Sequence, residues 1–330
     1  MRHKGIALVA GLATACMLMT ACSGSPGATA PAAGSSPGAA ASGGSGKTLT
    51  IGLSPSNLQQ DFFNQIKESA QKEADAEGIK LVVSDPGGDS DKQVSQIQDF
   101  ITQKVDAIIF LPAGATAATV PVKAAHAAGI PIVTVDRNPD GAPGDTFIAT
   151  DSVASAKALG EYSIKLMNGQ ANIGIIQGQI GTTPQVDREN GWGQAMGEAA
   201  GMKQVAEQAS LQWAQDEGYN IASDMLQAHP EINFFFGQAD ALALGAVQAA
   251  KAANRSDIKI VGFDGDPAGL QAVKDGTLAA TMCQQTQLMG KMAIQSAVKL
   301  INGETVPPQQ LQSATLITTD NVDQFIANHP

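Results

Sequence analysis

Two short apolar runs, Thr48-Leu-Thr-Ile-Gly-Leu53 and Lys80-Leu-Val-Val83, flank an amphipathic stretch that extends from Asp61 to Glu77. Within that stretch, apolar residues recur at the spacing of a single helix face: Phe62, Phe63, Ile66, Ala70 and Ala74. Continuous apolar strands that alternate with helices are typical of a parallel sheet whose two faces are both covered. Residues 48–83 therefore predict a strand, a helix and a second strand of one α/β sheet.

The same unit recurs through the rest of the chain. Further apolar runs of strand length are Ala107-Ile-Ile-Phe110, Ile130-Pro-Ile-Val-Thr-Val135, Ala171-Asn-Ile-Gly-Ile-Ile176, Ile232-Asn-Phe-Phe-Phe236, Ile258-Lys-Ile-Val-Gly-Phe263 and Leu278-Ala-Ala-Thr-Met282. A break near Thr150 separates the runs into two successive sets. Two sets favour two doubly wound parallel-sheet lobes over one very wide sheet.

The N-terminal part of the chain has a different character. Arg2 and Lys4 precede an apolar segment of about 17 residues, which is short for a membrane span and typical of a secretion signal. Small residues precede Cys22, as in a bacterial lipobox, so we expect residues 1–21 to be a lipoprotein signal peptide and Cys22 to carry the lipid. A cleaved signal without lipid and a membrane anchor are weaker alternatives. The rest of residues 22–46 is almost wholly Ser, Gly, Ala and Pro, which is typical of a flexible tether.

Composition argues against several classes of function. The chain has 20 Lys and Arg against 31 Asp and Glu, a net charge of −11, and no basic run, so it is a poor candidate for nucleic-acid binding. Of its three cysteines only Cys283 lies in the body, so no disulfide framework is expected. The four histidines do not cluster along the chain, and we expect neither a metal nor a cofactor.

Polar side chains follow the predicted strands. Ligands of open parallel sheets bind outside the carboxyl ends of the strands, which is where this chain carries Asp136, Arg137 and Asp264. A carboxylate accepts hydrogen bonds from two hydroxyls, and a guanidinium presents a planar fork of donors, so these groups suit a polyhydroxylated ligand. Helix capping is the alternative interpretation. Capping is favoured for Asp240 and Ser152, whereas ligand contact is favoured for the adjacent pair Asp136 and Arg137.

Several motifs along the body occur in the order and spacing of a known family. They are Asp61-Phe62-Phe63, Gly129-Ile-Pro-Ile-Val-Thr-Val-Asp-Arg137, Asp187-Arg188, Gln227-Ala-His-Pro230, Val261-Gly-Phe-Asp-Gly265 and Asp275-Gly-Thr-Leu-Ala-Ala-Thr281. The body resembles the periplasmic sugar-binding proteins of the ribose/galactose-binding class, which capture substrates for ABC importers. This resemblance implies a type I periplasmic-binding-protein-like α/β fold, with two doubly wound parallel-sheet lobes joined by a three-strand hinge.

The resemblance also implies lobe boundaries and a binding site. The N-terminal lobe would comprise residues 47–150 plus 285–312, and the C-terminal lobe residues 151–284 plus 313–330. The residues expected to bind the ligand are Ser56, Gln60, Phe62, Phe63, Asp136, Arg137, Arg188, Trp213, Asp264 and Gln284. The aromatic residues of this set would sandwich the sugar ring, and the charged and amide residues would hydrogen-bond its hydroxyls.

By the same resemblance, the protein would capture a monosaccharide or polyol by hinge closure and deliver it to an ABC permease. We expect a monomer, anchored by the lipid at Cys22 on the outer side of the cytoplasmic membrane of a bacterium. The chain departs from the ribose binders at Leu111 and Ala239, which stand where an amide is expected, and at Gln60, which stands in place of an Asn. An unpaired hydroxyl costs about 1–3 kcal/mol. The ligand is therefore expected to be another pentose, a polyol, a cyclitol or a partly deoxygenated sugar rather than ribose in its familiar pose.

Other classes of function have weaker support in the sequence. Gly191-Trp-Gly193-Gln-Ala-Met-Gly197 resembles a dinucleotide fingerprint, but its third glycine falls one residue late. Asp264-Gly-Asp266-Pro-Ala268 lacks the Thr of the haloacid dehalogenases, and we expect no enzyme. Sugar-sensing repressors of the same core fold carry a helix-turn-helix where this chain has its signal. A lipoprotein that senses a ligand for a membrane receptor is an alternative that the sequence leaves open.

Overall fold

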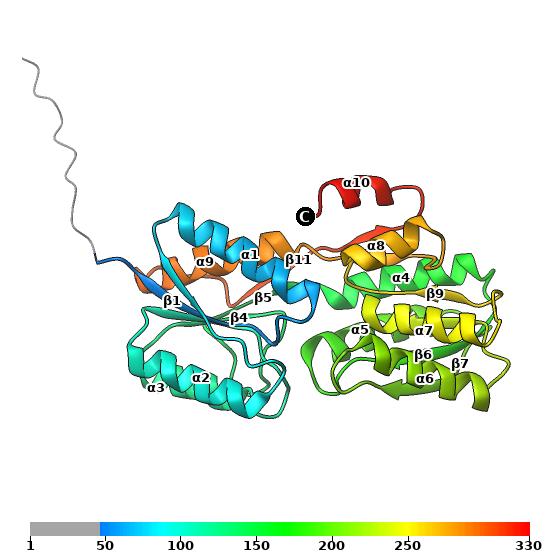
Figure 1. Ribbon diagram of the computed structural model, residues 1–330, viewed down its shortest axis with the longest axis horizontal. Helices are drawn as coiled ribbons and strands as arrows, with labels where there is room; N and C mark the ends of the chain where they lie inside the picture. Colours follow the sequence, from blue (N-terminus) through cyan, green and yellow to red (C-terminus); the bar gives the residue numbers. More distant parts are fainter. Residues whose placement is uncertain (1–46) are drawn as a thin grey trace, which may run out of the picture. The chain divides into compact units, whose positions relative to one another are not determined.

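The computed structural model describes residues 47–330, which form one compact unit. The predicted signal peptide, the lipidation site at Cys22 and the predicted tether lie outside the described residues. Two parallel sheets organise the unit, and helices cover both faces of each sheet (Figure 1). Within residues 47–330, none of the helices combines the length and apolar character that a membrane crossing requires.

The first lobe is built on a sheet with the strand order β11-β5-β4-β3-β1-β2, in which all pairs are parallel. Its strands are β1 (Thr50–Ser54), β2 (Lys80–Val83), β3 (Ala107–Phe110), β4 (Ile132–Val135), β5 (Thr146–Thr150) and β11 (Gln309–Gln312). Its helices are α1 (Asp61–Ala76), α2 (Ser90–Gln103), α3 (Thr119–Ala127) and α9 (Thr286–Ile301). Helices α1 and α9 lie together on one face of the sheet, and α2 and α3 lie together on the other (Figure 1).

The second lobe is built on a smaller parallel sheet with the order β7-β6-β8-β9. Its strands are β6 (Ala171–Gln177), β7 (Met202–Ala209), β8 (Phe234–Gly237) and β9 (Lys259–Val261). An antiparallel pair, β10 (Thr281–Cys283) and β12 (Thr315–Ile317), lies beside them, and isolated parallel bridges join Val261 to Ala280 and Asp264 to Cys283. Its helices are α4 (Ser152–Leu166), α5 (Thr183–Met196), α6 (Gln215–Ala228), α7 (Asp240–Ala252), α8 (Pro267–Lys274) and α10 (Val322–Ala327).

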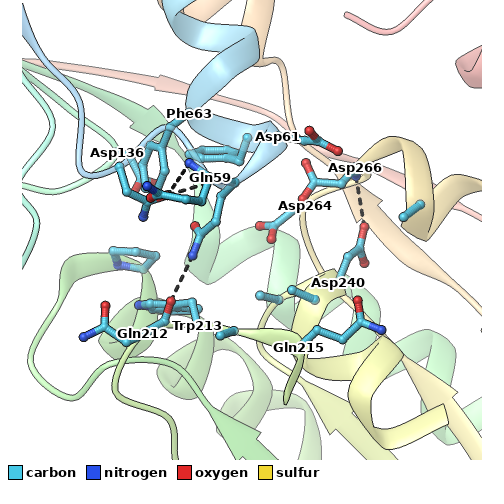
Figure 2. A pocket seen from close by; sticks show the side chains of 18 of the residues that line it. Gln59, Asp61, Phe63, Asp136, Gln212, Trp213, Gln215, Asp240, Asp264 and Asp266 are labelled. Carbon is cyan, nitrogen blue, oxygen red and sulfur yellow. Dashed lines mark hydrogen bonds between the residues drawn. The ribbon is translucent and has the colours of Figure 1, made fainter. Parts of the chain in front are cut away.

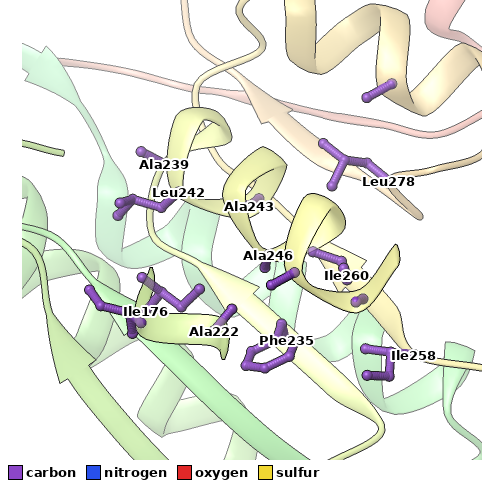
Figure 3. Packing of buried hydrophobic residues seen from close by; sticks show 14 of the residues in the cluster. Ile176, Ala222, Phe235, Ala239, Leu242, Ala243, Ala246, Ile258, Ile260 and Leu278 are labelled. Atoms are coloured by element: carbon purple, nitrogen blue, oxygen red, sulfur yellow. The ribbon is translucent and has the colours of Figure 1, made fainter. Parts of the chain in front are cut away.

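The side chains of each strand alternate between two cores. In β3, Ile109 packs with α1 and α9, whereas Ile108 and Phe110 pack with α2 and α3. In β8, Phe235 points into the core under α6 and α7, which Figure 3 shows from close by. Its neighbour Phe236 packs on the opposite face, where Trp192 stacks on it at 4.3 Å between ring centroids. Burial on both faces explains why these strands are apolar without interruption.

The predicted two sets of strands and the doubly wound architecture are confirmed. Helix α1 buries the five apolar residues predicted to share its inner face. Four strands were not predicted: β5, β7, β11 and β12. The expected break near Thr150 is confirmed, because β5, which lies between β4 and β11 in the first sheet, ends at that residue and the next strand, β6, belongs to the second sheet. The run that begins at Leu278 forms a strand only from Thr281, and that strand pairs antiparallel with β12.

The chain passes between the two lobes at three places that lie side by side. These are the steps from β5 to α4, from β10 to α9 and from β11 to β12. The first crossing is joined to the second by a hydrogen bond of 2.6 Å, which the hydroxyl of Thr150 donates to Oε1 of Gln284. The first crossing is joined to the third by the backbone N–H of Asp151, which donates to the carbonyl of Gln312 at 2.8 Å. The crossings are therefore held together by side-chain and backbone hydrogen bonds.

Candidate functional site

A cavity of about 400 Å³ lies between the two lobes, where the carboxyl ends of the strands of both sheets face each other. Figure 2 shows it from close by, with Phe63 and Asp136 of the first lobe opposite Gln212 and Trp213 of the second. The predicted site residues that line the cavity are Gln60, Phe62, Phe63, Asp136, Arg137, Arg188, Trp213 and Asp264. The fold thus gathers in one cavity side chains that lie as far as 204 positions apart in the sequence, from Gln60 to Asp264.

Two of the predicted site residues do not line the cavity. Ser56 is buried behind the wall of the first lobe, where its carbonyl accepts a hydrogen bond from the N–H of Gly88. Gln284 is buried at the second crossing, and its Nε2 donates to Oδ1 of Asp264 at 2.7 Å. The position of Gln284 makes it a positioning residue for the Asp264 carboxylate rather than part of the cavity wall.

In the first lobe, a buried aspartate and arginine follow β4. Asp136 has a φ of 62°, a left-handed conformation that few non-glycine residues adopt. Its Oδ2 lies 3.4 Å from Nε of Arg137, and Nη1 of Arg137 donates to the carbonyls of Pro112 at 2.9 Å and Ala113 at 3.2 Å. Burial raises the pKa of Asp136, and the positive charge of Arg137 partly offsets that rise. The side-chain orientation of this pair is therefore fixed before any ligand arrives.

In the second lobe, Arg188 of α5 pairs with Asp264, which follows β9. Nη2 of Arg188 lies 3.1 Å from Oδ1 of Asp264, and Nη1 donates to the carbonyl of Gln238. Asp264 also has a positive φ, of 135°. Burial raises the pKa of Asp264 to about 7, although Arg188 opposes the rise. Each lobe thus contributes one close contact between an arginine and an aspartate.

Aromatic rings flank the two guanidinium groups. The Cζ of Arg137 lies 5.6 Å from the ring centroid of Phe63 and 5.8 Å from that of Trp213. The Cζ of Arg188 lies 5.5 Å from the Trp213 ring and 3.9 Å from the Phe263 ring. Trp213 therefore contacts cations from both lobes, at distances at which a ring attracts a cation. The cavity joins flat apolar walls to charged hydrogen-bonding groups.

The expectation that Asp240 caps a helix is wrong. Asp240 is the first residue of α7 and fully buried, and its carboxylate accepts hydrogen bonds from outside that helix. The donors are the N–H groups of Gly265 and Asp266, at 2.8 and 3.0 Å, and the hydroxyl of Thr281, at 2.6 Å. Burial raises the pKa of Asp240 to about 6 despite these donors. Asp240 holds the loop after β9 in place beneath the cavity.

The expectation that Ser152 caps a helix is also wrong. Ser152 is the first residue of α4 and is buried. The cap is its neighbour Asp151, whose carboxylate accepts a hydrogen bond of 3.0 Å from the N–H of Ala154. A carboxylate at this position satisfies one of the free N–H groups at the start of the helix.

Several residues that line the cavity were not predicted. They are Asn57, Gln59, Asp61, Gln212, Gln215 and Asp266, among others. Five of these six lie in the loops before α1 and α6 or at the first residue of those helices. The loop before α6 follows β7, and it was missed because that strand was not predicted. Across the cavity mouth, Nε2 of Gln60 donates to the carbonyl of Gln212 at 2.9 Å, which joins the two lobes directly.

The two apolar residues that replace an amide of the ribose binders have different positions in the structure. Ala239 lines the cavity at the start of α7. Leu111 is 1% exposed and packs in the core beneath α1 and α9. The expectation that Leu111 leaves a ligand hydroxyl unpaired is therefore wrong, because its side chain does not face the cavity. Within residues 47–330, there is no group of three or more His, Cys, Asp or Glu side chains placed to hold a metal ion.

Comparison with known proteins agrees with this geometry. A family model described as a periplasmic binding protein domain matches residues 51–305. The chain belongs to this periplasmic binding protein family. Ribose import binding protein RbsB of Bacillus subtilis (strain 168) is 33% identical over 263 residues, which span 80% of this chain and 85% of that protein. A xylitol-binding protein of Mycolicibacterium smegmatis is 31% identical over 283 residues, 84% of this chain and 80% of that protein.

Solved structures extend the agreement to the fold of the family. An ABC transporter solute binding protein from Bacillus halodurans C-125, with bound myo-inositol, superposes with a TM-score of 0.81. It is 31% identical, and the match covers 86% of this chain and 99% of that one. The resemblance to sugar-binding proteins of ABC importers and the type I fold are thereby confirmed. All three relatives are named as binding proteins, in agreement with the prediction of a binding protein rather than an enzyme.

Proposed function

We propose that this periplasmic binding protein captures a monosaccharide or polyol in the cavity between its lobes and delivers it to an ABC permease. The observation that carries the proposal is the pair of buried arginine–aspartate contacts, one from each lobe, next to Phe63 and Trp213. Carboxylates and guanidinium groups match vicinal hydroxyls, and aromatic faces match the C–H faces of a sugar ring. A single small polyhydroxylated molecule satisfies both kinds of surface.

Capture proceeds through closure of the lobes. We assign residues 47–150 plus 285–312 to one moving body and 151–284 plus 313–330 to the other, so that the three crossings form the hinge. A ligand that contacts both bodies stabilises the closed form, because only that form offers all the contacts at once. The hydrogen bond from Gln60 to the Gln212 carbonyl belongs to the closed form and breaks on opening.

The residues of the cavity wall and the ligands named for similar proteins limit the set of compounds to test. Ala239 offers no hydrogen bond where ribose binders carry an amide. The relatives named above are a ribose and a xylitol binder and a protein with bound myo-inositol. The compounds to test are therefore pentoses, open-chain polyols and cyclitols, together with 6-deoxy sugars.

We place the protein outside the cytoplasmic membrane, as a monomer held by a lipid on Cys22. A Cys22→Ala variant is then expected to leave the membrane fraction and appear in the soluble fraction of the producing bacterium. Unchanged membrane attachment of this variant would contradict the anchor. Import of the ligand by intact cells, measured with and without the gene, separates delivery to a permease from signalling to a receptor.

Intrinsic fluorescence tests binding directly, because the chain has only two tryptophans. Trp213 lines the cavity, whereas Trp192 is 2% exposed and stacks in the second-lobe core. A Trp192→Phe variant therefore reports the cavity alone. We expect at least one compound of the panel to shift its emission with saturation. Absence of a shift with every compound, confirmed by calorimetry, would refute the proposal.

The matched variants are Asp136→Asn and Asp136→Ala. Either leaves Arg137 without its carboxylate in a buried site, and we expect at least about hundredfold weaker binding of any hit. An Asp224→Asn variant, which alters an exposed acid on α6 away from the cavity, controls for the change in net charge. Unchanged affinity in both Asp136 variants would show that the site assignment is wrong.

A further inference from the structure

The cavity carries more negative than positive side chains. The acids that line it are Asp61, Asp136, Asp240, Asp264 and Asp266, and the bases are Arg137 and Arg188. Two of the acids are paired with the two arginines, at 3.4 and 3.1 Å. Asp240 has no arginine but accepts three hydrogen bonds from the protein. Asp61 and Asp266, one from each lobe, remain as acids without a positively charged partner among residues 47–330.

Asp266 serves no structural purpose that the described residues reveal. It occupies the N-cap position of α8, yet its carboxylate makes no capping hydrogen bond to that helix. Its backbone N–H donates to Asp240, and its backbone carbonyl accepts from the N–H of Leu270. The side-chain atom Oδ1 is buried and, within residues 47–330, has no hydrogen-bond partner. A buried polar atom of this kind usually has a partner, so its partner is expected to be the ligand.

Asp61 places a second carboxylate near Asp266. Asp61 begins α1 in the first lobe, and Figure 2 shows it on the same side of the cavity as Asp264 and Asp266. Burial raises the pKa of Asp266 well above its usual range, and the charges of Asp264, Asp240 and Asp61 add to that rise. Closing the lobes therefore brings like charges together unless a positive charge or a proton lies between them.

We propose that the cavity is built for a ligand that carries a protonated amino group, an amino sugar or an amino polyol, whose ammonium group binds between Asp266 and Asp61. The proposal rests on the proposed function, because the hydroxyls of the same ligand meet the arginine–aspartate pairs. An ammonium supplies three donors and one positive charge, which match the unpartnered Oδ1 and the two acids without a positively charged partner. A neutral hydroxyl in its place supplies one donor and no positive charge.

Binding of an ammonium next to Asp266 is expected to change the number of protons that the protein binds. Without ligand, burial and the charges of the neighbouring acids raise the pKa of Asp266. A bound ammonium stabilises the carboxylate and lowers this pKa, so that protons held by the carboxyl pass to the buffer. Calorimetric titrations in buffers of different ionisation enthalpy, at pH 7, therefore report proton release for an amino ligand. A neutral ligand is expected to release fewer protons.

The test compares matched pairs of compounds on the whole mature chain by calorimetry. The pairs are D-glucosamine with D-glucose, 1-amino-1-deoxyxylitol with xylitol, and an aminodeoxy-myo-inositol with myo-inositol. We expect at least one amino compound to bind about ten- to hundredfold more tightly than its neutral partner. The variants are Asp266→Asn and Asp61→Asn, with Asp224→Asn as the control of net charge. Asp266→Asn is expected to weaken binding of the amino compound much more than binding of its neutral partner, so that the ratio of the two affinities falls towards one.

The outcomes are distinguishable. Binding of neutral compounds with no tighter binding of any amino partner would overturn the amine proposal and leave the proposed function in place. Binding of neither kind would overturn both. A preference for the amine that survives in Asp266→Asn would overturn the assignment to Asp266. A titration with CaCl2 alone completes the test, because calcium binding that is lost in Asp266→Asn would assign the site to an inorganic cation instead.

Discussion

Replacing Gly178 by alanine is expected to displace the tryptophan of the cavity wall. An ideal Cβ on Gly178 would lie 1.8 Å from Cη2 of Trp213, 2.0 Å from Cζ2 and 2.2 Å from Cζ3. Carbon atoms pack at about 3.5–4.0 Å. The indole ring would have to move by about 1.5–2 Å to accept one methyl group. Gly178 therefore sets the position of the ring without contributing a side chain to the cavity.

The ring of Trp213 has little freedom to yield. Its residue has a φ of 60°, its side chain is 6% exposed, and the guanidinium groups of Arg137 and Arg188 lie on it. Overpacking of this kind costs about 1–3 kcal/mol of folding free energy. Alanine lowers the conformational entropy of the unfolded chain relative to glycine, and this stabilises the folded state by about 0.4–1 kcal/mol. We expect a net loss of about 1–2 kcal/mol in the free energy of unfolding and at least tenfold weaker ligand binding.

Urea denaturation and calorimetric titration of a double-mutant cycle test this reasoning. Trp213→Phe removes the outer ring atoms that the new methyl would meet, so Gly178→Ala should cost much less in that background. Gly193→Ala in α5 is the control, because an ideal Cβ at Gly193 would meet no heavy atom within 4 Å beyond its own helix backbone. Helix propensity predicts a gain of up to about 1 kcal/mol for this control. An equal cost of Gly178→Ala in both backgrounds would refute the clash, and unchanged binding would refute the role of the ring.

Three further predictions concern hydrogen bonds and protons. Gln284→Leu removes the amide that orients Asp264, and we expect it to weaken ligand binding by about 1–3 kcal/mol in calorimetry. A smaller loss of binding free energy would show that this hydrogen bond is dispensable. Because burial raises the pKa of Asp264 to about 7 and that of Asp240 to about 6, the folded state keeps protons that the unfolded state loses above about pH 4. Their contribution to stability should therefore fall between pH 4 and 7 in urea denaturation, and Asp264→Asn should flatten the profile, whereas an unchanged slope would contradict the raised pKa. Gln60→Ala removes the hydrogen bond to the Gln212 carbonyl, and we expect it to raise the ligand dissociation rate by up to about tenfold in stopped-flow fluorescence. An unchanged dissociation rate would argue that this hydrogen bond does not stabilise the closed form.

The core strands were predictable because burial on both faces leaves an uninterrupted apolar sequence. Strand β7 was not, because it is an edge strand with several exposed polar side chains, and its sequence lacks a clear alternation. Strand β5 is short and bounded by Thr146 and Thr150, whose buried hydroxyls make hydrogen bonds that only the fold reveals. Strands β11 and β12 are short and contain few buried apolar residues.

The candidate site was predictable where it follows predicted strands. Asp136, Arg137 and Asp264 were found in this way, and the resemblance supplied Arg188 and Trp213. The structural role of Asp240 was not predictable, since its three donors come from residues 25 to 41 positions away. Residues such as Asp266 were missed for a related reason. A free buried oxygen is a property of the packed structure and leaves no pattern in the sequence.

The hinge and the cavity share one chain of hydrogen bonds. It runs from the Thr150 hydroxyl to Gln284 Oε1, and from Gln284 Nε2 to Oδ1 of Asp264, which also meets Arg188 at 3.1 Å. Oδ1 is thus engaged twice by the protein, and among the described residues Oδ2 is the atom of Asp264 left for a ligand. A ligand that draws on Oδ2 acts on a carboxylate already tied to two crossings of the hinge. The orientation of this acceptor therefore depends on the joined lobes, and we expect neither lobe alone to reproduce the site.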